Sequence, residues 1–281
     1  MEKYGLVLEG GGMRGIYTAG VLDVFMEHGI TFDGVIGVSA GAIHGCSFVS
    51  GQKGRSIRYY KKYCKDKRFM SFHSWLTTGN IVGTQFCYHD LPEKLDMYDY
   101  EAFNKSDTRF YVTCANVETG RAEYLEIHDM KEEVDLMRAS ASLPYFSKVV
   151  EFQGKKLLDG GCCDSIPVKA FQKMGYTKNV VVLTRHDGYR KKPENTALAK
   201  VCYRQYPEFS HMLQNRHIKY NRTLREVKKL EQSKEAFVIR PSEPLNIGRL
   251  EQDENKIQQV YDLGRRDAEK RLSELLNWKQ G

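Results

Sequence analysis

A serine between two glycines, Ser39 in the pattern G-V-S-A-G over residues 37–41, is the first feature of this chain that could do chemistry. An apolar run over residues 32–36 predicts a short strand before it, and residues 40–49 predict a helix after it. A tight strand-to-helix turn holds a serine hydroxyl above the end of a sheet, and flanking glycines let the backbone bend without collisions. This context favours a nucleophile elbow, in which the serine attacks a carbonyl carbon.

A glycine run, G-G-G-M-R-G over residues 10–15, follows the strand predicted at residues 4–9. Such a run exposes backbone N–H groups, and the start of the next helix adds the positive end of its dipole, so the run predicts an anion site. A dinucleotide pyrophosphate is one candidate, because the run fits G-x-G-x-x-G, but it needs an acidic residue after the second strand. The other candidate is the oxyanion of an acyl-transfer intermediate. The second strand leads to Ser39 and not to an acid, which favours the oxyanion.

Asp159 is the candidate base for that serine. Residues 156–158 predict a short strand that ends at this aspartate, directly before two glycines. Catalytic side chains collect at strand ends in open α/β sheets, although an aspartate before a glycine turn is also typical of an ordinary turn. A Ser-His-Asp triad is the alternative, with His186, after a strand predicted at residues 180–184, as its histidine. His44, on the elbow helix, is interpreted as a packing or capping residue.

Length and composition indicate one globular domain. The chain has 281 residues, 41% of them hydrophobic and only 7 of them proline, which is enough to bury a large core. No segment approaches the roughly 20 apolar residues of a membrane span, and the N-terminus lacks the pattern of a Sec-type signal. We therefore expect a single α/β domain over residues 1–281 and a cytoplasmic location. The motifs lie within residues 5–170, and residues 171–281 are expected to form a C-terminal helical completion.

Cysteine usage and charge bear on cofactors and partners. The seven cysteines are scattered, none forms C-x-x-C, and neither H-E-x-x-H nor an EF-hand pattern occurs, so we expect reduced thiols and no metal or other cofactor. The net charge is +7, and eight Lys or Arg lie between residues 53 and 68, four of them on one helical face: Arg58, Lys61, Lys62 and Lys65. Such a face is typical of a solvated helix, or of a surface that meets anionic lipid headgroups or nucleic acid.

The sequence beyond Pro167 predicts elements but no chemistry. We expect a helix at residues 168–174, a core strand at 179–184, a long basic helix at 207–231 and a short strand at 236–239. Asp253 is expected to cap a final helix with an apolar stripe that packs in the core. A basic loop over residues 188–193 is placed at the rim of the active site, where a lid or a lipid contact would lie.

Four stretches together resemble the patatin-like phospholipase family, in a bacterial type. They are the glycine run at 10–15, the G-V-S-A-G pattern at 37–41, A-S-A-S-L-P at 139–144, and D-G-G at 159–161 with Ile166-Pro167 behind it. The resemblance implies a three-layer α/β/α sandwich with a central, mostly parallel sheet, and a Ser-Asp dyad in place of a triad. Ser39 then matches the nucleophile and Asp159 the base. The oxyanion loop matches Gly10, Gly11 and Gly12, with Arg14 beside it.

These observations predict a serine-dependent lipid acyl hydrolase of the phospholipase A or lysophospholipase type. The N–H group of Ala40 is expected to join the glycine loop in holding the oxyanion. Arg14 is expected either to bind a phosphate headgroup or to anchor its loop. The expected partners are a phospholipid or another lipid ester and the inner face of a membrane, met peripherally through the basic surface, and not nucleic acid. A soluble carboxylesterase with the same dyad is the nearest alternative, and a nucleotide- or lipid-binding protein that uses the glycine loop is a different class.

Overall fold

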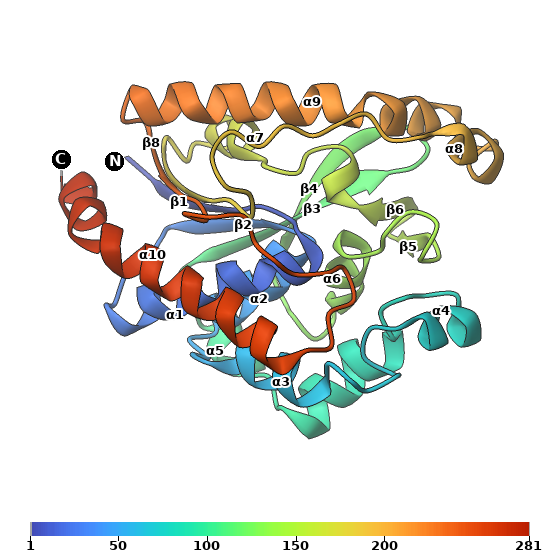
Figure 1. Ribbon diagram of the computed structural model, residues 1–281, viewed down its shortest axis with the longest axis horizontal. Helices are drawn as coiled ribbons and strands as arrows, with labels where there is room; N and C mark the ends of the chain where they lie inside the picture. Colours follow the sequence, from blue (N-terminus) through green and yellow to red (C-terminus); the bar gives the residue numbers. More distant parts are fainter. Residues whose placement is uncertain (1, 281) are drawn as a thin grey trace.

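An eight-stranded mixed sheet forms the centre of the computed structural model, which describes residues 2–280 (Figure 1). Five strands run parallel in the order β3-β2-β1-β7-β8, and β4, β5 and β6 join them through antiparallel pairs. The expectation of a central, mostly parallel sheet is thus confirmed. The strands are β1 (Tyr4–Leu8), β2 (Gly34–Val38), β3 (Arg109–Asn116), β4 (Arg121–Ile127), β5 (Val150–Phe152), β6 (Lys155–Asp159), β7 (Lys178–Val182) and β8 (Ala236–Ile239).

Helices cover both faces of this sheet, so the expected three-layer α/β/α sandwich is confirmed (Figure 1). The α-helices are α1 (Gly15–Glu27), α2 (Ala40–Val49), α3 (Arg55–Tyr63), α4 (Phe72–Thr78), α5 (Tyr100–Asn104), α6 (Val134–Ser140), α7 (Val168–Lys173), α8 (Ala197–Cys202), α9 (Pro207–Gln232) and α10 (Glu254–Gln280). Strand residues alternate between the two faces. Leu6 and Leu8 lie in the core shared with α1, α2 and α10, whereas Val7 lies in the core shared with α7 and α9. Burial on both faces explains why β1 reads as a continuous apolar run.

The main expected elements form close to their predicted positions. The helix predicted at residues 40–49 is α2, and Asp253 caps α10 by accepting a hydrogen bond from the backbone N–H of Asn255 at 2.9 Å. The strand predicted from residue 32 begins two residues later, at Gly34. Phe32 does not enter the sheet because its ring packs between those of Phe25 and Phe48, each 6.0 Å away between ring centres.

The C-terminal part of the chain completes the sheet and covers α1. Strand β8 pairs with β7, and α10 lies across α1 at a very close approach. A Cβ atom placed on Gly264 would lie 2.1 Å from the Tyr17 carbonyl oxygen, and one on Gly20 would lie 2.2 Å from that of Tyr261, so only glycine fits at either position. The Tyr17 hydroxyl also donates a hydrogen bond to Asp267 at 3.1 Å. Such contacts favour the single domain expected over residues 1–281, which stays a prediction.

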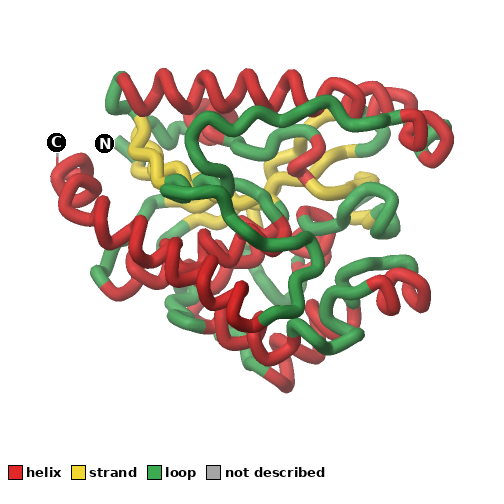
Figure 2. Tube along the Cα trace, in the orientation of Figure 1, coloured by secondary structure: helices red, strands yellow, loops and turns green. Residues whose placement is uncertain are grey.

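Short helices and two long loops surround one end of the sheet. Residues 64–108 form α4, a π-helical segment (Phe86–Leu95) and α5. Two long loops, residues 183–196 and 240–253, connect β7 to α8 and β8 to α10 (Figure 2). Short 3-10 helices follow β1 and β6 at Gly12–Arg14 and Gly160–Cys162. Of the helices within residues 2–280, none combines the length and the apolar character that crossing a bilayer requires.

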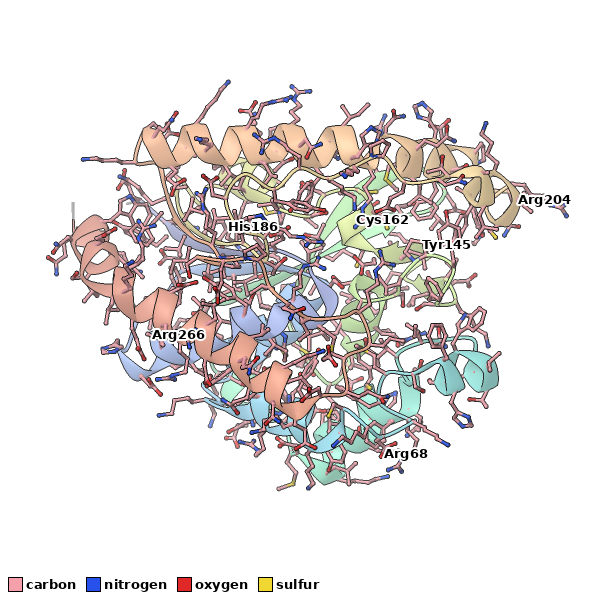
Figure 3. All side chains as sticks on the ribbon, in the orientation of Figure 1. Arg68, Tyr145, Cys162, His186, Arg204 and Arg266 are labelled. Carbon is pink, nitrogen blue, oxygen red and sulfur yellow. The ribbon has the colours of Figure 1, made fainter. Side chains whose placement is uncertain are left out.

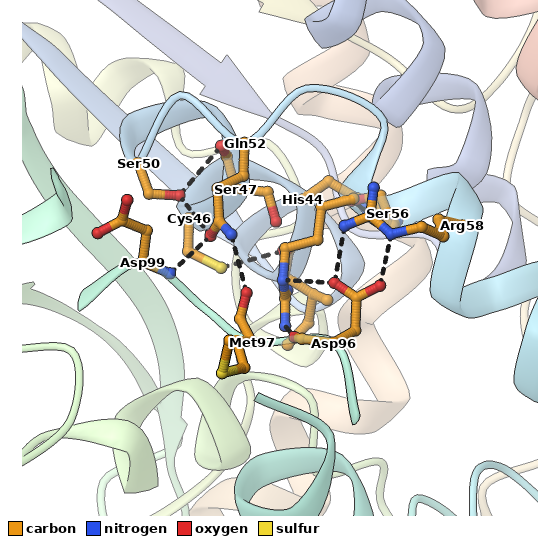
Figure 4. Close-up of polar contacts among 12 residues, drawn as sticks. His44, Cys46, Ser47, Ser50, Gln52, Ser56, Arg58, Asp96, Met97 and Asp99 are labelled. Atoms are coloured by element: carbon orange, nitrogen blue, oxygen red, sulfur yellow. Dashed lines mark hydrogen bonds and ion pairs between the residues drawn. The ribbon is translucent and has the colours of Figure 1, made fainter. Parts of the chain in front are cut away.

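The basic face predicted on residues 58–65 makes contacts within the chain. Arg58 Nε lies 2.6 Å from Asp96 Oδ2 (Figure 4), Lys61 Nζ lies 2.8 Å from Gln258 Oε1, and Lys65 Nζ lies 2.8 Å from Glu254 Oε1. The last two partners belong to the start of α10, so this face joins the N-terminal and C-terminal parts of the chain. Two of its four cations are therefore paired with carboxylates, and contact of this face with lipid stays a prediction.

Candidate active site

Ser39 lies in the turn between β2 and α2, with φ of 53° and ψ of −121°. A non-glycine residue with positive φ is strained and persists only where its surroundings hold it. The flanking glycines make the turn possible by close approach. A Cβ atom on Gly41 would lie 2.5 Å from the Leu8 carbonyl oxygen, and one on Gly37 would lie 2.5 Å from the backbone nitrogen of Ala42. The turn therefore has the shape of a nucleophile elbow, and α2 begins directly after the serine.

The carboxyl ends of β2 and β6 meet beside β3. A strand has two hydrogen-bonding edges, and β4 occupies one edge of β3 along residues 110–116. Strands β2 and β6 share the other edge. Parallel β2 pairs as far as Val38 with Thr113, and antiparallel β6 takes over where Cys114 pairs with Asp159. Ser39 follows Val38, so the serine and the aspartate reach the same point from opposite directions. Asp159 is thus at a strand end, as predicted, but on an antiparallel strand.

Two serines of the A-S-A-S-L-P stretch form hydrogen bonds with the backbone at these strand ends. Ser140 Oγ accepts a hydrogen bond from the Ser39 N–H at 3.0 Å and donates one to the Thr113 carbonyl oxygen at 2.8 Å. The Ser142 carbonyl oxygen accepts the Asp159 N–H at 2.8 Å. One short segment at the end of α6 thus holds the backbones of both Ser39 and Asp159. The sequence marked this stretch as a motif, but only the structure assigns its contacts.

Burial raises the pKa of Asp159, whose side chain is held inside the protein. The Ser39 hydroxyl, the Gly161 N–H and the charge of Arg216 favour the carboxylate and so oppose that rise in pKa. The Gly161 N–H donates to Asp159 Oδ1 at 2.7 Å, and no backbone N–H of residues 2–280 donates to Oδ2. A buried carboxylate with a raised pKa is a better proton acceptor than an exposed one, since basicity follows the pKa.

The glycine run at residues 10–15 lies against the elbow. A Cβ atom on Gly10 would lie 3.3 Å from the Ser39 Cβ, and Gly12 adopts φ of 56°, a conformation that favours glycine. Within residues 2–280 the backbone N–H groups of Gly11, Gly12 and Ala40 have no hydrogen-bond acceptor. Beneath the loop, Glu9 is buried and accepts hydrogen bonds from the Tyr220 hydroxyl at 2.5 Å and the Thr184 N–H at 2.6 Å. This buried carboxylate fixes the loop to α9 and to the end of β7.

A cavity of about 530 Å³ opens at this point, and Ser39, Asp159, Ala40 and the glycine loop all line it. Its largest part is apolar and comes from residues 43–146. Aromatic and aliphatic side chains of α3, α4, the connection between them, the π-helical segment and α6 form that wall, among them Tyr59, Tyr60, Phe69, Phe72, Tyr88, Leu91 and Met137. A volume of this size with a mostly apolar wall is typical of a site that encloses a small ligand or an acyl chain.

Comparison with known proteins assigns the family. A model of the family described as patatin-like phospholipase matches residues 6–171. The chain belongs to this patatin-like family. The sequence resemblance noted above is therefore confirmed over more than half of the chain. A second model, described as a domain of unknown function (DUF6363), matches residues 206–280.

The patatin-like chain is similar to proteins from bacteria and yeasts. The uncharacterized protein YjjU of Escherichia coli is 30% identical over 185 residues, which are 65% of this chain and 52% of YjjU. Lysophospholipase NTE1 of Candida albicans is 30% identical over 192 residues, 65% of this chain and 13% of NTE1. The solved structure of VipD from Legionella pneumophila aligns with 98% of this chain and 67% of that one, at 13% identity and a TM-score of 0.48. The matched region thus spans about half of YjjU and a small part of NTE1.

Residues beyond the patatin-like match also reach the cavity. Arg14 lines it from the glycine loop, and four further cations line it from the C-terminal part of the chain: Arg185, Lys191, Arg216 and Arg249. The basic loop at residues 188–193 was expected at the rim, and Lys191 bears this out. Sequence reasoning did not find the three arginines, because they lie on two loops and a helix that only the tertiary fold brings together.

No histidine lines the cavity within residues 2–280, although the chain has eight. His186 lies on the loop after β7 (Figure 3), and its ring packs edge-on against Tyr189 with 6.3 Å between ring centres. His44 is buried on α2, where its Nδ1 lies 2.9 Å from Ser56 Oγ (Figure 4), and burial lowers its pKa to about 3. His44 is therefore a neutral packing residue, and the geometry does not support the alternative triad through His186.

The cysteine thiols form no disulfide within residues 2–280, as the sequence predicts. All seven cysteines are free, including the adjacent Cys162 and Cys163, and five of the seven are buried. Burial raises the pKa of the Cys114 thiol, which lies in the core beside Asp159's strand. Within residues 2–280, no group of three or more His, Cys, Asp or Glu side chains is placed to hold a metal ion.

Proposed function

We propose that this patatin-like chain is a serine-dependent hydrolase of fatty-acyl esters in phospholipids or lysophospholipids. The reaction passes through an acyl-enzyme on a dyad of Ser39 and Asp159. One observation carries the proposal: a strained serine and a buried carboxylate sit at facing strand ends and line one largely apolar cavity. The match to the patatin-like phospholipase family supports the proposal, since Ser39 and Asp159 both lie within residues 6–171.

Acylation begins when Asp159 accepts the proton of the Ser39 hydroxyl. The serine oxygen attacks the ester carbonyl carbon, and the carbonyl oxygen takes up the negative charge. The N–H groups of Gly11, Gly12 and Ala40, which have no acceptor within residues 2–280, stabilise that oxyanion, and Gly10 lets the loop approach the serine. Collapse of the intermediate breaks the bond to the alcohol, and Asp159 returns the proton to the departing oxygen.

Deacylation uses the same groups in reverse. Asp159 takes a proton from a water molecule, whose oxygen attacks the acyl carbonyl on Ser39. The same N–H groups hold the second oxyanion, and the serine leaves with the proton from Asp159 as the fatty acid is released. A single carboxylate thus serves as base and acid in both halves, which its raised pKa favours.

The cavity supports a lipid ester as the substrate. Its apolar wall from residues 43–146 fits an acyl chain, since burial of each CH₂ group contributes about 0.8 kcal/mol. The relatives called lysophospholipase NTE1 give a second reason to place lysophospholipids among the candidates. Arg14, whose buried Nε has no hydrogen-bond partner within residues 2–280, is proposed to bind headgroup oxygens beside the glycine loop.

The membrane contact that we propose uses the apolar rim of the cavity. On α4, Phe72 is 59% exposed and also lines the cavity, and Leu76 is 77% exposed. Exposed apolar side chains beside a lipid-binding cavity are suited to insert among headgroups at a bilayer surface. A cytoplasmic location and contact with the inner membrane face remain predictions. Substitution of Phe72 and Leu76 by serine is expected to reduce cosedimentation with phospholipid vesicles.

The test of the hydrolase is turnover of a nitrophenyl butyrate ester and of a lysophospholipid by the wild type, Ser39→Ala, Asp159→Asn and His186→Ala. Ser39→Ala and Asp159→Asn are expected to lose activity on both substrates, by about 10²-fold or more for the aspartate. His186→Ala is expected to retain activity, because this ring does not line the cavity. A fluorophosphonate probe should label the wild type and not Ser39→Ala.

Other outcomes would point to the alternatives. Activity on the short ester with none on lysophospholipid would indicate a soluble carboxylesterase with the same dyad. Full activity of Ser39→Ala, or no labelling of the wild type, would refute the nucleophile. In that case the glycine loop would have to be tested as a nucleotide- or lipid-binding element.

A further inference from the structure

The polar part of the cavity carries an excess of positive charge. Six cations line the cavity, and only two carboxylates do, Asp159 and Glu194. One of the six, Arg55 on α3, pairs with Asp96, which leaves five cations to consider. The cations come from the glycine loop, from the loop that follows β7, from α9 and from the loop that follows β8: Arg14, Arg185, Lys191, Arg216 and Arg249. In Figure 1, α9 lies on one side of the sheet, and α3 and α4, which contribute to the apolar wall, lie on the other; the loop after β8 runs between them to the start of α10.

Most of this charge has no internal partner. Lys191 pairs with Glu194, with 2.7 Å between Nζ and Oε1. Within residues 2–280, Arg14, Arg185, Arg216 and Arg249 form no ion pair. Arg185 stacks over the Tyr189 ring at 4.2 Å, and Arg216 donates from Nε to the Gly161 carbonyl oxygen at 2.8 Å. These contacts orient the two guanidinium groups and leave their terminal nitrogens able to meet an anion, while the charge of Arg216 also acts on the carboxylates of Asp159 and Glu194.

The cations are close enough to disfavour one another. Burial lowers the pKa of Arg14, and the charge of Arg185 lowers it further. Burial, followed by the charge of Arg216, likewise lowers the pKa of Lys191. Like charges in a partly buried site cost free energy unless an anion joins them. Arginine is suited to that anion, because its planar fork binds phosphate oxygens in pairs.

We propose that Arg185, Arg216 and Arg249, with Arg14 beside them, form a subsite for the anionic phosphate headgroup of a lysophospholipid. The proposal rests on the hydrolase function above and deepens it by naming the substrate class. The preferred substrates carry a headgroup of net negative charge, such as a phosphate monoester. A choline headgroup would bring its own positive charge among the arginines and is disfavoured.

The position of the subsite fits a lipid headgroup. Arg216 binds the carbonyl of Gly161, and the N–H of that same residue binds the carboxylate of Asp159. The anion subsite is therefore adjacent to the dyad, as the phosphate of a lysophospholipid is only a few bonds from its acyl ester. A phosphate monoester carries a charge of about −1.5 to −2 at pH 7, which matches the excess better than a choline diester does. All three arginines lie outside the patatin-like match at residues 6–171.

The experiment compares kcat/KM for lysophosphatidic acid, lysophosphatidylcholine with the same acyl chain, and nitrophenyl butyrate. The wild type is expected to prefer lysophosphatidic acid to the choline lipid by about tenfold or more. The double variant Arg185→Gln/Arg249→Gln should reduce that preference about tenfold. It should also reduce the ratio of kcat/KM for lysophosphatidic acid to kcat/KM for nitrophenyl butyrate. Arg266→Gln is the matched control, since this arginine is exposed on α10 and does not line the cavity (Figure 3).

Each result decides the proposal. Equal rates for the two lysolipids, or a preference that the double variant keeps, would overturn it. Inorganic phosphate and glycerol 3-phosphate are added as competitors to separate a headgroup site from a site for free phosphate. If they inhibit even butyrate hydrolysis while the two lysolipids react equally, the arginines bind free phosphate and the headgroup assignment is wrong. If the wild type cleaves no ester, the hydrolase proposal fails, and calorimetric binding of the two lysolipids to wild type and double variant then tests the subsite alone.

Discussion

Replacement of Ser140 by alanine tests how the elbow is held. The Ser140 hydroxyl is fully buried, and it both accepts from the Ser39 N–H and donates to the Thr113 carbonyl oxygen. Alanine removes both bonds and leaves the Ser39 N–H buried without an acceptor, which costs about 1–3 kcal/mol. If the whole cost falls on the strained conformation of Ser39, the rate of acylation drops by about 5-fold to about 150-fold, since each 1.36 kcal/mol is about tenfold.

The assay is burst kinetics of acylation with nitrophenyl butyrate, together with thermal unfolding. Ser47→Ala is the control, because the Ser47 hydroxyl is buried on the elbow helix and has no hydrogen-bond partner within residues 2–280. We expect Ser47→Ala to leave both acylation and stability close to those of the wild type. Equal behaviour of Ser140→Ala and Ser47→Ala would refute the reasoning, because the strain at Ser39 would then be held by other contacts.

Three further predictions concern charge and packing. Burial raises the pKa of Asp159 above its unfolded value, so wild-type stability falls as pH rises through that raised pKa. Asp159→Asn should unfold at a higher temperature than the wild type at pH 8. This difference in unfolding temperature should be smaller at pH 4. The pKa of His44 is lowered to about 3, so below pH 6.5 the unfolded state takes up a proton that the folded state does not. This difference lowers the free energy of unfolding by about 2 kcal/mol at pH 5. In denaturant titrations, His44→Gln should therefore lose less stability than the wild type between pH 7.5 and pH 5. Gly264→Ala places a Cβ atom 2.1 Å from the Tyr17 carbonyl oxygen and should destabilise the protein by about 1–3 kcal/mol in thermal unfolding. Gly248→Ala, whose Cβ atom would meet only Glu251 Oε2 at an ordinary 3.7 Å, should not. A stable Gly264→Ala protein would contradict the close crossing of α1 and α10.

Local sequence determined the elements that carry the chemistry. The elbow at Ser39 follows from glycines whose missing side chains allow close approach, and the glycine loop follows from backbone conformations that only glycine adopts easily. Helix α2 and the cap at Asp253 were also predictable, because caps and apolar periodicity act over a few residues. Family motifs then placed Asp159 opposite Ser39, which local physics alone left as one of two alternatives.

The tertiary structure decided which groups meet. The facing ends of β2 and β6 depend on β4 occupying the other edge of β3, which is a property of strand order and not of any single strand. The bridge through Ser140 and the arginine cluster from residues 185, 216 and 249 join segments far apart in the chain. The contacts of the basic face at residues 58–65 with Asp96, Gln258 and Glu254 also join distant segments. Sequence patterns report local preference and burial, whereas contacts between distant segments depend on how the layers pack, and that information appears only in the folded chain.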